Sequence, residues 1–431
     1  MEKVTVIGAG LAGVEAANTL ANNGIKVRLI EMKPKEKSPA HHSNLFAELV
    51  CSNSLKAERI DSAAGLLKEE MRILGSICVE TALGCKVAAG GALAVDRNVF
   101  SKTITEKIKQ NKNIEIVEDR VDEIPEGYVI VATGPLTDGK LAENIALVCS
   151  SEYLNFYDAA APIVTKDSID FEKAFYQSRY SKGGDDYINC PFSKDEYEAF
   201  HNELVNAESA KLSEFDKPPT VYEGCMPIEI LAKRGLDAAR FGPMKPVGLV
   251  NPKTGHRPWA AVQLRAENND NTLYNLVGFQ TNLKFPEQKR VFSMIPGLEN
   301  AEFVRYGVMH RNSFINSPKL LANDFSLKSD NRIYFCGQLS GVEGYMESAA
   351  SGIIAARSLV NRLNGKNPEQ FPKFTMLGAL SGYISDETVK NFQPMGANFG
   401  VLPTLEEKLR DKRERYMALS MRSLNWYKEN Y

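Results

Sequence analysis

The stretch "VTVIGAGLAGVEAANTLANNGIKVRLIE", residues 4–31, constrains the fold more than any other part of the chain. Its two ends have the apolar composition of strands, and a helical pattern lies between them. Gly8, Gly10 and Gly13 form a G-x-G-x-x-G turn, and Glu31 ends the second strand 23 residues after Gly8. This pattern predicts a strand, a glycine turn, a helix and a second strand at the start of an α/β fold.

Each part of this unit has a mechanical reason. Gly8 permits the tight turn, Gly10 lets the backbone approach a pyrophosphate, and Gly13 allows the helix to pack closely on the strand. The helix N-terminus offers N–H groups to phosphate oxygens, and Glu31 has the spacing of a carboxylate that binds ribose. Because all the parts fit, we predict dinucleotide binding. The alternative is a glycine-rich turn without a ligand.

A second glycine unit lies late in the chain, in "RIYFCGQLSGVEGYMESAASGIIAARSLV", residues 332–360. It has a strand, a turn containing Gly337, Gly341 and Gly344, and a long helix of small residues. Such a unit is typical of FAD proteins, where it approaches the flavin. The buried strand in "GYVIVATGP", which ends near Gly134, also resembles a strand of flavoproteins. The alternative is that the small residues serve only helix packing.

The region between the two units predicts a separate body. "YNLVGF" and "EFVRYGVM" alternate as strands of a mixed or antiparallel sheet do, and "KDEYEAFHNELVNAE" is helical. We therefore predict an α/β fold: a Rossmann-like, discontinuous FAD-binding domain with an inserted mixed α/β domain. The predicted boundaries are 1–153 for the first part of the FAD-binding domain, 154–324 for the substrate or RNA insertion, and 325–431 for the second part with a C-terminal basic helix.

Composition narrows the functional classes. The formal net charge is −2, so any nucleic-acid surface must be a local patch. One candidate is the segment 404–431, predicted to be a charged helix, although a solvated helix face is the default interpretation. Its clustered basic residues are Lys408, Arg410, Lys412, Arg413 and Arg415.

The same sequence predicts the compartment. No apolar run reaches the roughly 18–20 residues of a membrane span, and the chain starts directly with a strand instead of a signal peptide. We therefore expect no membrane partner and a cytoplasmic location. The chain has 7 cysteines without a C-x-x-C pair, and its 5 histidines show no metal-ligand spacing. We expect neither a disulfide framework nor a metal.

Two cysteines have surroundings that suggest chemistry. Cys51 in "FAELVCSNSL" precedes Ser52, Asn53 and Ser54, which favour a helix start, and Cys225 in "VYEGCMPIEILAKRG" also precedes a predicted helix. A helix N-terminus lowers a thiol pKa. A thiolate beside a flavin could add to C6 of uracil and activate C5 toward a one-carbon unit. The alternative is two small buried hydrophobes, the interpretation we give to Cys78, Cys149 and Cys336.

At these residues the sequence resembles a known family. "GAGLAGVEAA", "NLFAELVCSNSL", "GALAVDR", "VIVATGPL", "YEGCMPIEILA", "FCGQLSGVEGYMESAASG" and "LGALSGYI" match the pattern of the TrmFO family. These are bacterial folate- and FAD-dependent uracil-C5 methyltransferases of RNA, related to the GidA flavoproteins. The resemblance runs from residue 7 to about residue 384, and the C-terminal helix cannot be matched residue by residue.

The resemblance implies the reaction. FAD is reduced by NADPH or NADH, and 5,10-methylenetetrahydrofolate supplies the carbon that reaches uracil C5. The expected target is the T-loop uridine at position 54 of tRNA. Cys51 and Cys225 align with the two functional cysteines of the family, of which one adds to C6 and the other assists removal of the C5 proton. We favour Cys51 as the nucleophile, although the sequence leaves the division open.

The resemblance also implies the binding residues. Tyr345 either stacks on a ring or belongs to the core. RNA contacts would come from Lys284, Lys289, Arg290 and the C-terminal basic residues, each of which also fits a solvated surface. No protein partner is inferred. The implied FAD contacts are Gly8, Ala9, Gly10, Leu11, Ala12, Gly13, Glu31, Arg97, Gly134, Gly337, Gly341 and Gly344.

Four alternative functions remain open at this point. The first is the same chemistry on a uridine of 23S ribosomal RNA. The second is the related, larger FAD protein that modifies the tRNA wobble uridine, although its extra C-terminal helical domains are missing here. The third is a plain NAD(P)H-dependent flavin oxidoreductase. The fourth is an FAD-sensing RNA chaperone without enzymatic activity.

Overall fold

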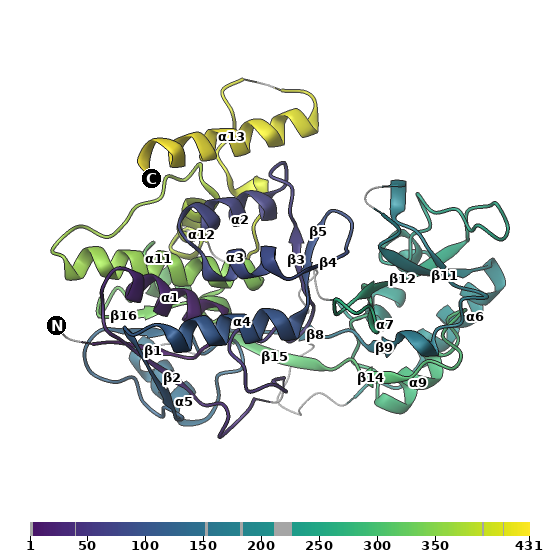
Figure 1. Ribbon diagram of the computed structural model, residues 1–431, viewed down its shortest axis with the longest axis horizontal. Coiled ribbons are helices and arrows are strands. Elements are labelled where there is room, and N and C mark those ends of the chain that lie inside the picture. The colour runs from purple at the N-terminus through teal and green to yellow at the C-terminus, as the bar shows by residue number, and fades with distance from the viewer. Residues whose placement is uncertain are drawn as a thin grey trace.

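The computed structural model describes residues 3–38, 40–150, 154–181, 184–210, 226–389, 392–407 and 409–431. Cys225 and Lys408, two residues with predicted roles, lie outside these ranges. Figure 1 shows a larger body that holds both chain ends and a smaller body formed by the middle of the chain. In the described residues, no helix is both long enough and apolar enough to cross a membrane.

Both glycine units contribute to one parallel sheet in the larger body. Four of its five described strands are buried at all or nearly all positions, as expected for a parallel sheet covered on both faces, whereas the edge strand 114–118 is mostly accessible. The predicted strand–turn–helix–strand unit is confirmed at the N-terminus, and the late strand joins the same sheet. In the described part of the chain its order is β16 (Ile333–Phe335), β7 (Val129–Val131), β1 (Val4–Ile7), β2 (Val27–Glu31) and β6 (Ile114–Glu118).

The two long glycine-unit helices, α1 (Leu11–Asn22) and α11 (Tyr345–Leu363), pack against each other on this sheet. A Cβ at Gly352 would lie 2.1 Å from the Ala12 carbonyl oxygen, so only glycine permits the approach. The small residues of α11 therefore serve helix packing, and the turn before α11 is still available to a ligand. The approach of this turn to a flavin stays a prediction.

Further helices cover the sheet. Two of them follow each other closely: α2 (Ala63–Ile73) ends, Gly75 turns with φ +79°, and α3 (Ile77–Gly84) begins after the Ser76 cap. The remaining elements beside them are β3 (Ser54–Ala57), β4 (Lys86–Val87), β5 (Ala92–Val95), α4 (Arg97–Gln110) and α5 (Gly139–Cys149).

The smaller body contains the predicted antiparallel sheet, with α6 (Lys194–Asn206) and α9 (Phe285–Phe292) beside it (Figure 1). Alpha-helix α6 begins with a capping box between Ser193 and Glu196. The short helices α7 (Ile228–Ala232) and α8 (Ala238–Phe241) complete it. Its described strands are, in order, β10 (Phe175–Tyr176), β11 (Tyr187–Phe192), β12 (Ala260–Ala266), β13 (Leu273–Leu276), β9 (Ile163–Thr165) and β14 (Phe303–Arg305).

Two hydrophobic cores correspond to the two bodies. One core takes residues from 4–149 and again from 314–427, and the other takes residues from 164–301. The antiparallel pair β8 (Leu154–Ala159) and β15 (Met309–Phe314) carries the chain between them, followed by α10 (Ser317–Leu320). Since Phe314, Ile315 and Leu321 already belong to the first core, the boundaries after residues 153 and 324 stay a proposal.

The C-terminal helix is shorter than predicted. Helix α13 spans Lys412–Asn430, and the Asp411 side chain caps its start by accepting a bond from Glu414 N–H. The described residues from 404 to 411 are not helical, so that part of the prediction is wrong. In Figure 1, α13 (yellow) lies over α2 and near α12 (Met376–Ile384).

Candidate active site

A cavity of about 410 Å³ lies at the carboxyl ends of the parallel strands, where α/β sheets bind their ligands. Both glycine turns line it, although they are more than 300 residues apart in the sequence. Predicted residues in the lining are Gly8, Gly10, Leu11, Ala12, Glu31, Cys51, Gly134, Gly337 and Gly344.

The first glycine turn is open toward the cavity at one position and closed at another. A Cβ at Gly10 would meet no atom within 4 Å, and Gly10 caps α1 without a side-chain hydrogen bond. A Cβ at Gly13 would lie 1.8 Å from the Gly8 carbonyl oxygen. Gly10 therefore leaves room for a phosphate at the helix N-terminus, whereas Gly13 serves packing.

Glu31 presents a buried carboxylate at the end of β2. Its Oε2 accepts a bond from Ala9 N–H at 2.7 Å, and its Oε1 accepts one from Lys33 N–H at 3.0 Å. Each carboxylate oxygen can accept a second bond, so ribose hydroxyl groups could still bind. Ala9 itself does not line the cavity and acts here by positioning Glu31.

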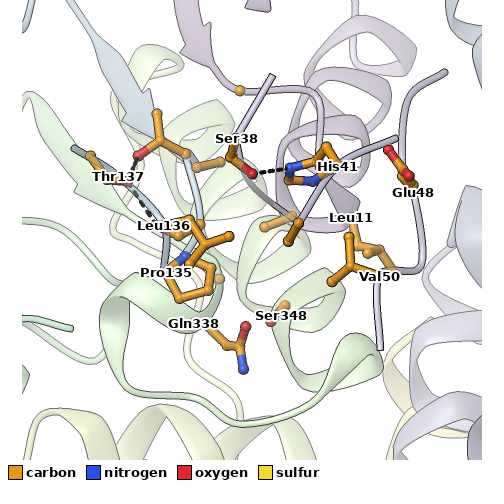
Figure 2. Close-up of a pocket in the computed structure, with 18 of the residues that line it drawn as sticks. Leu11, Ser38, His41, Glu48, Val50, Pro135, Leu136, Thr137, Gln338 and Ser348 are labelled. Carbon is orange, nitrogen blue, oxygen red and sulfur yellow. Dashed lines mark hydrogen bonds between the residues drawn. The ribbon is translucent and has the colours of Figure 1, made fainter. Parts of the chain in front are cut away.

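The middle of the cavity is mostly apolar. Figure 2 shows Pro135 and Leu136 across the hollow from Leu11 and Val50, with the polar side chain of Gln338 nearby. A cavity with an acid, an open helix N-terminus and apolar walls fits an elongated dinucleotide with an aromatic ring system. The residues present therefore fit FAD.

Two polar side chains in the lining of the cavity are hydrogen-bonded to each other. Ser38 Oγ and His41 Nδ1 lie 2.6 Å apart, as the dashed line in Figure 2 marks. Burial lowers the pKa of His41, and the neighbouring Lys33 lowers it further. His41 therefore tends to be neutral and able to accept a hydrogen bond.

Besides Ala9, three predicted FAD contacts lie outside the lining. A Cβ at Gly341 would lie 2.4 Å from Phe392 Cζ, so this glycine shapes the turn and does not face the cavity. Gly13 packs on Gly8, as described above. Arg97 is bound to Glu267, with Nε 2.6 Å from Glu267 Oε2, and donates from Nη1 to the Leu49 carbonyl oxygen at 2.9 Å.

Cys51 lines the cavity but does not precede a helix. The residues after it lead into strand β3, in which Ser54 pairs with Ala94 of β5, so the predicted helix start at Ser52–Ser54 is wrong. The half-buried sulfur lies 2.9 Å from Tyr345 Oη, in the second glycine unit. The cavity therefore brings this thiol to the turn that was predicted to approach a flavin.

Three arginines surround the Cys51 loop, which we define as residues 49–53. Arg97 reaches it from α4, whereas Arg265 in β12 and Arg305 in β14 reach it from the smaller body. Burial favours a lower pKa for the Arg97 guanidinium, but Glu267 outweighs it and holds that pKa above its usual value. Sequence reasoning missed Arg265 and Arg305; their only signal was a charged residue inside an apolar strand pattern.

Cys225 lies outside the described residues. The chain after it begins α7 with Pro227 as the N-cap, and Ile228 N–H donates to the Gln280 carbonyl oxygen at 2.8 Å. Gln280 lines the cavity. The segment that follows Cys225 is therefore tied to a cavity residue.

The other cysteines match the interpretation as core residues. Cys78, Cys149 and Cys336 are buried, and burial raises the pKa of Cys149 to about 11. Within the described ranges, no group of three or more histidine, cysteine, aspartate or glutamate side chains could hold a metal ion.

Of the predicted RNA-binding cations of the smaller body, Lys289 and Arg290 are exposed and Lys284 is half-buried. Lys284 pairs with Glu208, and Arg290 pairs with Glu203 and with Glu287. Such surface pairs are weak and can open when a polyanion competes for the cation. The assignment of these residues and of Lys289 to RNA stays a prediction.

Comparisons with known proteins agree with these features. A family model described as "Glucose inhibited division protein A" matches residues 3–367. The methylenetetrahydrofolate–tRNA-(uracil-5-)-methyltransferase TrmFO of Acetivibrio thermocellus is 59% identical over 430 residues, which is 100% of this chain and 98% of that protein. The protein of the same name from Ligilactobacillus salivarius is 54% identical over 99% of this chain and 98% of its own.

Solved structures show the same fold at lower identity. Two crystal forms of Aquifex aeolicus GidA superpose with TM-scores of 0.68 and 0.69, at 16% and 17% identity. Each match covers 99% of this chain, and 73% and 75% of the GidA chains. The discontinuous Rossmann-like fold predicted from sequence is thereby confirmed.

Proposed function

This chain belongs to the TrmFO family of GidA-like proteins, and from that membership we propose that it methylates C5 of a uridine in tRNA. The carbon comes from 5,10-methylenetetrahydrofolate, and the electrons come from NADPH or NADH through FAD. The proposed site of action is the cytoplasm, where unmodified tRNA and these cofactors are found together.

One observation supports the proposal more than any other. Cys51 lines the same cavity as the first glycine turn and Glu31, and its sulfur contacts Tyr345 of the second glycine unit. A plain flavin oxidoreductase does not require a thiol at this position. A thiol beside the cavity is what addition to, or proton removal from, a uracil ring requires.

The residues of the cavity have proposed roles toward the cofactor. Glu31 would hold the ribose, and the turn at Gly8 and Gly10 would receive the pyrophosphate at the N-terminus of α1. Gly337 and Gly344 would lie along the flavin. When bound, FAD supplies the reducing equivalents and carries the one-carbon unit to the base.

The chain's own chemistry is assigned to two cysteines. We assign addition to uracil C6 and removal of the C5 proton to Cys51 and Cys225, with Cys51 as the proposed nucleophile. The target base must leave its stack to reach the cavity. The names of the relatives specify tRNA, which favours tRNA over ribosomal RNA, and the T-loop uridine is the proposed position.

The reaction can be tested directly. Purified protein is incubated with an unmodified tRNA transcript, methylenetetrahydrofolate and NADPH, and the nucleosides are then analysed. We expect 5-methyluridine that depends on folate and disappears when the T-loop uridine is changed to cytidine. A fragment of 23S ribosomal RNA is the competing substrate, and its preferred methylation would contradict the assignment to tRNA.

The cysteine roles have their own measurement. Cys51→Ala and Cys225→Ala should each reduce methylation to background while FAD stays bound, and Cys78→Ala is the matched control. Loss of methylation with retained NADPH oxidation excludes a plain flavin oxidoreductase. Full methylation by either variant would remove that cysteine from the mechanism.

A further inference from the structure

The hydrogen bonds around Tyr345 Oη determine the direction of its contact with Cys51. This oxygen accepts a bond from Cys51 N–H at 2.8 Å and another from Ser52 N–H at 3.2 Å. A phenol oxygen has two acceptor positions and one hydrogen. Because two backbone N–H groups already occupy the acceptor positions, the hydroxyl hydrogen is left to donate to Cys51 Sγ, 2.9 Å away.

The ionisation of Tyr345 is consistent with that direction. Burial raises the pKa of the Tyr345 hydroxyl well above its usual value, and the neighbouring Cys51 raises it further. The hydroxyl therefore keeps its hydrogen at neutral pH. A sulfur that receives such a bond is stabilised in its negatively charged form, since a charged acceptor makes the stronger hydrogen bond.

The arginines bind the residues next to Cys51 from two bodies of the protein. Arg97 donates to the Leu49 carbonyl oxygen, Arg305 donates to the Val50 carbonyl oxygen, and Arg265 Nη2 donates to Ser52 Oγ at 2.8 Å. The bonded atoms belong to the residues on either side of Cys51. Three guanidinium groups are therefore hydrogen-bonded to main-chain and side-chain atoms that flank the thiol.

The remaining charges nearby do not cancel these three. Glu267 pairs with Arg97 and also attracts Arg265 and Arg305. On the cavity side, Lys56 Nζ and Glu347 Oε1 form their own pair at 2.8 Å, and Glu343 accepts a bond from Gln338. Arg265 and Arg305 are also attracted by nearby tyrosines and by Cys51 itself, and Arg97 repels both. Among the described residues, three guanidinium charges and the Glu267 carboxylate thus leave an excess of positive charge beside the Cys51 loop.

We propose that Cys51 is held as a thiolate, with Tyr345 as its hydrogen-bond donor and the three arginines as its counter-charge. In this arrangement Arg265 and Arg305 are positioning residues: the smaller body supplies the charge and geometry that make a cysteine of the larger body reactive. The proposal rests on the proposed function only for the use of the thiolate, because ionisation is measurable without RNA or folate.

The test measures ionisation at one sulfur. The full-length protein as purified is treated with iodoacetamide between about pH 5 and pH 10, and alkylation of the Cys51 peptide is quantified by mass spectrometry. Accessibility scales the rate equally at every pH, so the midpoint reports ionisation. We expect a wild-type midpoint at least one unit below the value of about 8.5 for an ordinary thiol.

Variants distinguish an effect of the Arg265 charge on the Cys51 midpoint from an effect of loop shape. Arg265→Gln should raise the midpoint by about one unit, whereas Arg265→Lys keeps the charge and should stay near wild type. Tyr345→Phe removes the donor and should also raise it. Arg332→Gln is the control: like Arg97 and Arg305, Arg332 donates to backbone carbonyl oxygens, those of Pro125 and Gly127, but in another part of the protein.

Each possible result supports or overturns the proposed thiolate or the role of one of its neighbours. An ordinary wild-type midpoint, or equal midpoints in wild type, Arg265→Gln and Tyr345→Phe, would overturn the proposal. An equal rise in Arg265→Lys and Arg265→Gln would reduce Arg265 to a structural support and overturn the role of its charge. If Arg265→Gln does not fold, Arg265→Lys and Tyr345→Phe give the answer. A protein that fails to methylate RNA but shows the low midpoint would contradict the proposed function and leave this inference standing.

Discussion

At the scale of single residues, the two glycines Gly10 and Gly13 look equivalent in the sequence motif but have opposite surroundings. Gly10 has φ −71°, which any residue can adopt, and open space where a Cβ would stand. Gly13 has a carbonyl oxygen in that place. Gly13 is therefore required by the fold, and we propose that Gly10 is required by the ligand.

This difference gives a paired prediction. Gly10→Val should leave the thermal midpoint of the apoprotein nearly unchanged but reduce FAD retention at least tenfold, because the new side chain fills the phosphate position. Gly13→Ala should destabilise the protein by about 2 kcal/mol or more, because helix and strand must separate. Calorimetry of the apoprotein and FAD fluorescence titration measure the two effects. Equal effects of both substitutions would refute the distinction.

At the scale of elements, a buried carboxylate fastens the C-terminal helix. Glu70 of α2 accepts bonds from Met376 N–H at 2.7 Å and Leu377 N–H at 2.9 Å, at the start of α12. It also accepts bonds from Ser423 Oγ at 2.6 Å and Tyr427 Oη at 3.4 Å, on α13. One side chain therefore joins three helices, which explains why α13 docks although its outer face is charged.

Glu70 makes stability depend on pH. Burial raises the pKa of Glu70 from 4.5 to about 7, and its hydrogen bonds only partly oppose this. Below about pH 4.5 the carboxyl is protonated in both the folded and unfolded states. As the pH rises from 4.5 to 7, the unfolded state loses the proton first. The free energy of unfolding therefore falls by about 3 kcal/mol over this range.

The variant Glu70→Gln should therefore flatten this decrease. Denaturant titrations at about pH 4.5 and pH 7 measure the free energy of unfolding at both ends of the window. Glu15 has the same shift, to about 7, so a part of the decrease should remain in Glu70→Gln. Glu69→Gln, whose side chain pairs with Arg72 on the surface of α2, is the control and should behave as wild type. An unchanged slope in Glu70→Gln would contradict the argument.

At the scale of the whole molecule, the two bodies meet at the Cys51 loop. Asn53, which is fully buried, donates from Nδ2 to the Val95 carbonyl oxygen at 3.1 Å and to the Ala266 carbonyl oxygen at 2.9 Å. Its Oδ1 accepts a bond from Arg265 Nε at 3.0 Å. The Asn53 amide thus makes hydrogen bonds to polar groups of both bodies beside the proposed thiolate.

We expect Asn53→Ala to lower the free energy of unfolding by about 2 kcal/mol or more, because it leaves buried polar groups without a partner. Chemical denaturation measures the loss. Asn202→Ala, on the exposed surface of α6, should change stability by less than about 0.5 kcal/mol. Equal stability of the two variants would show that this amide does not connect the bodies.

The sequence by itself determined the elements whose causes are local. The glycine turns, the strands on either side of them and Glu31 at the end of β2 could be predicted because turn geometry, apolar periodicity and the spacing of the acid act within about thirty residues. The resemblance to a family then supplied the cofactor and the reaction.

Only the tertiary structure decided what surrounds Cys51. Its neighbours Ser52–Ser54 favour a helix locally, but the chain instead enters strand β3 at Ser54, which pairs with β5. Arg97, Arg265 and Arg305 lie far apart in the sequence, and no local rule brings their charges to one loop. Strand pairing and helix packing act between distant segments, so the charge around a reactive sulfur is a property of the folded chain.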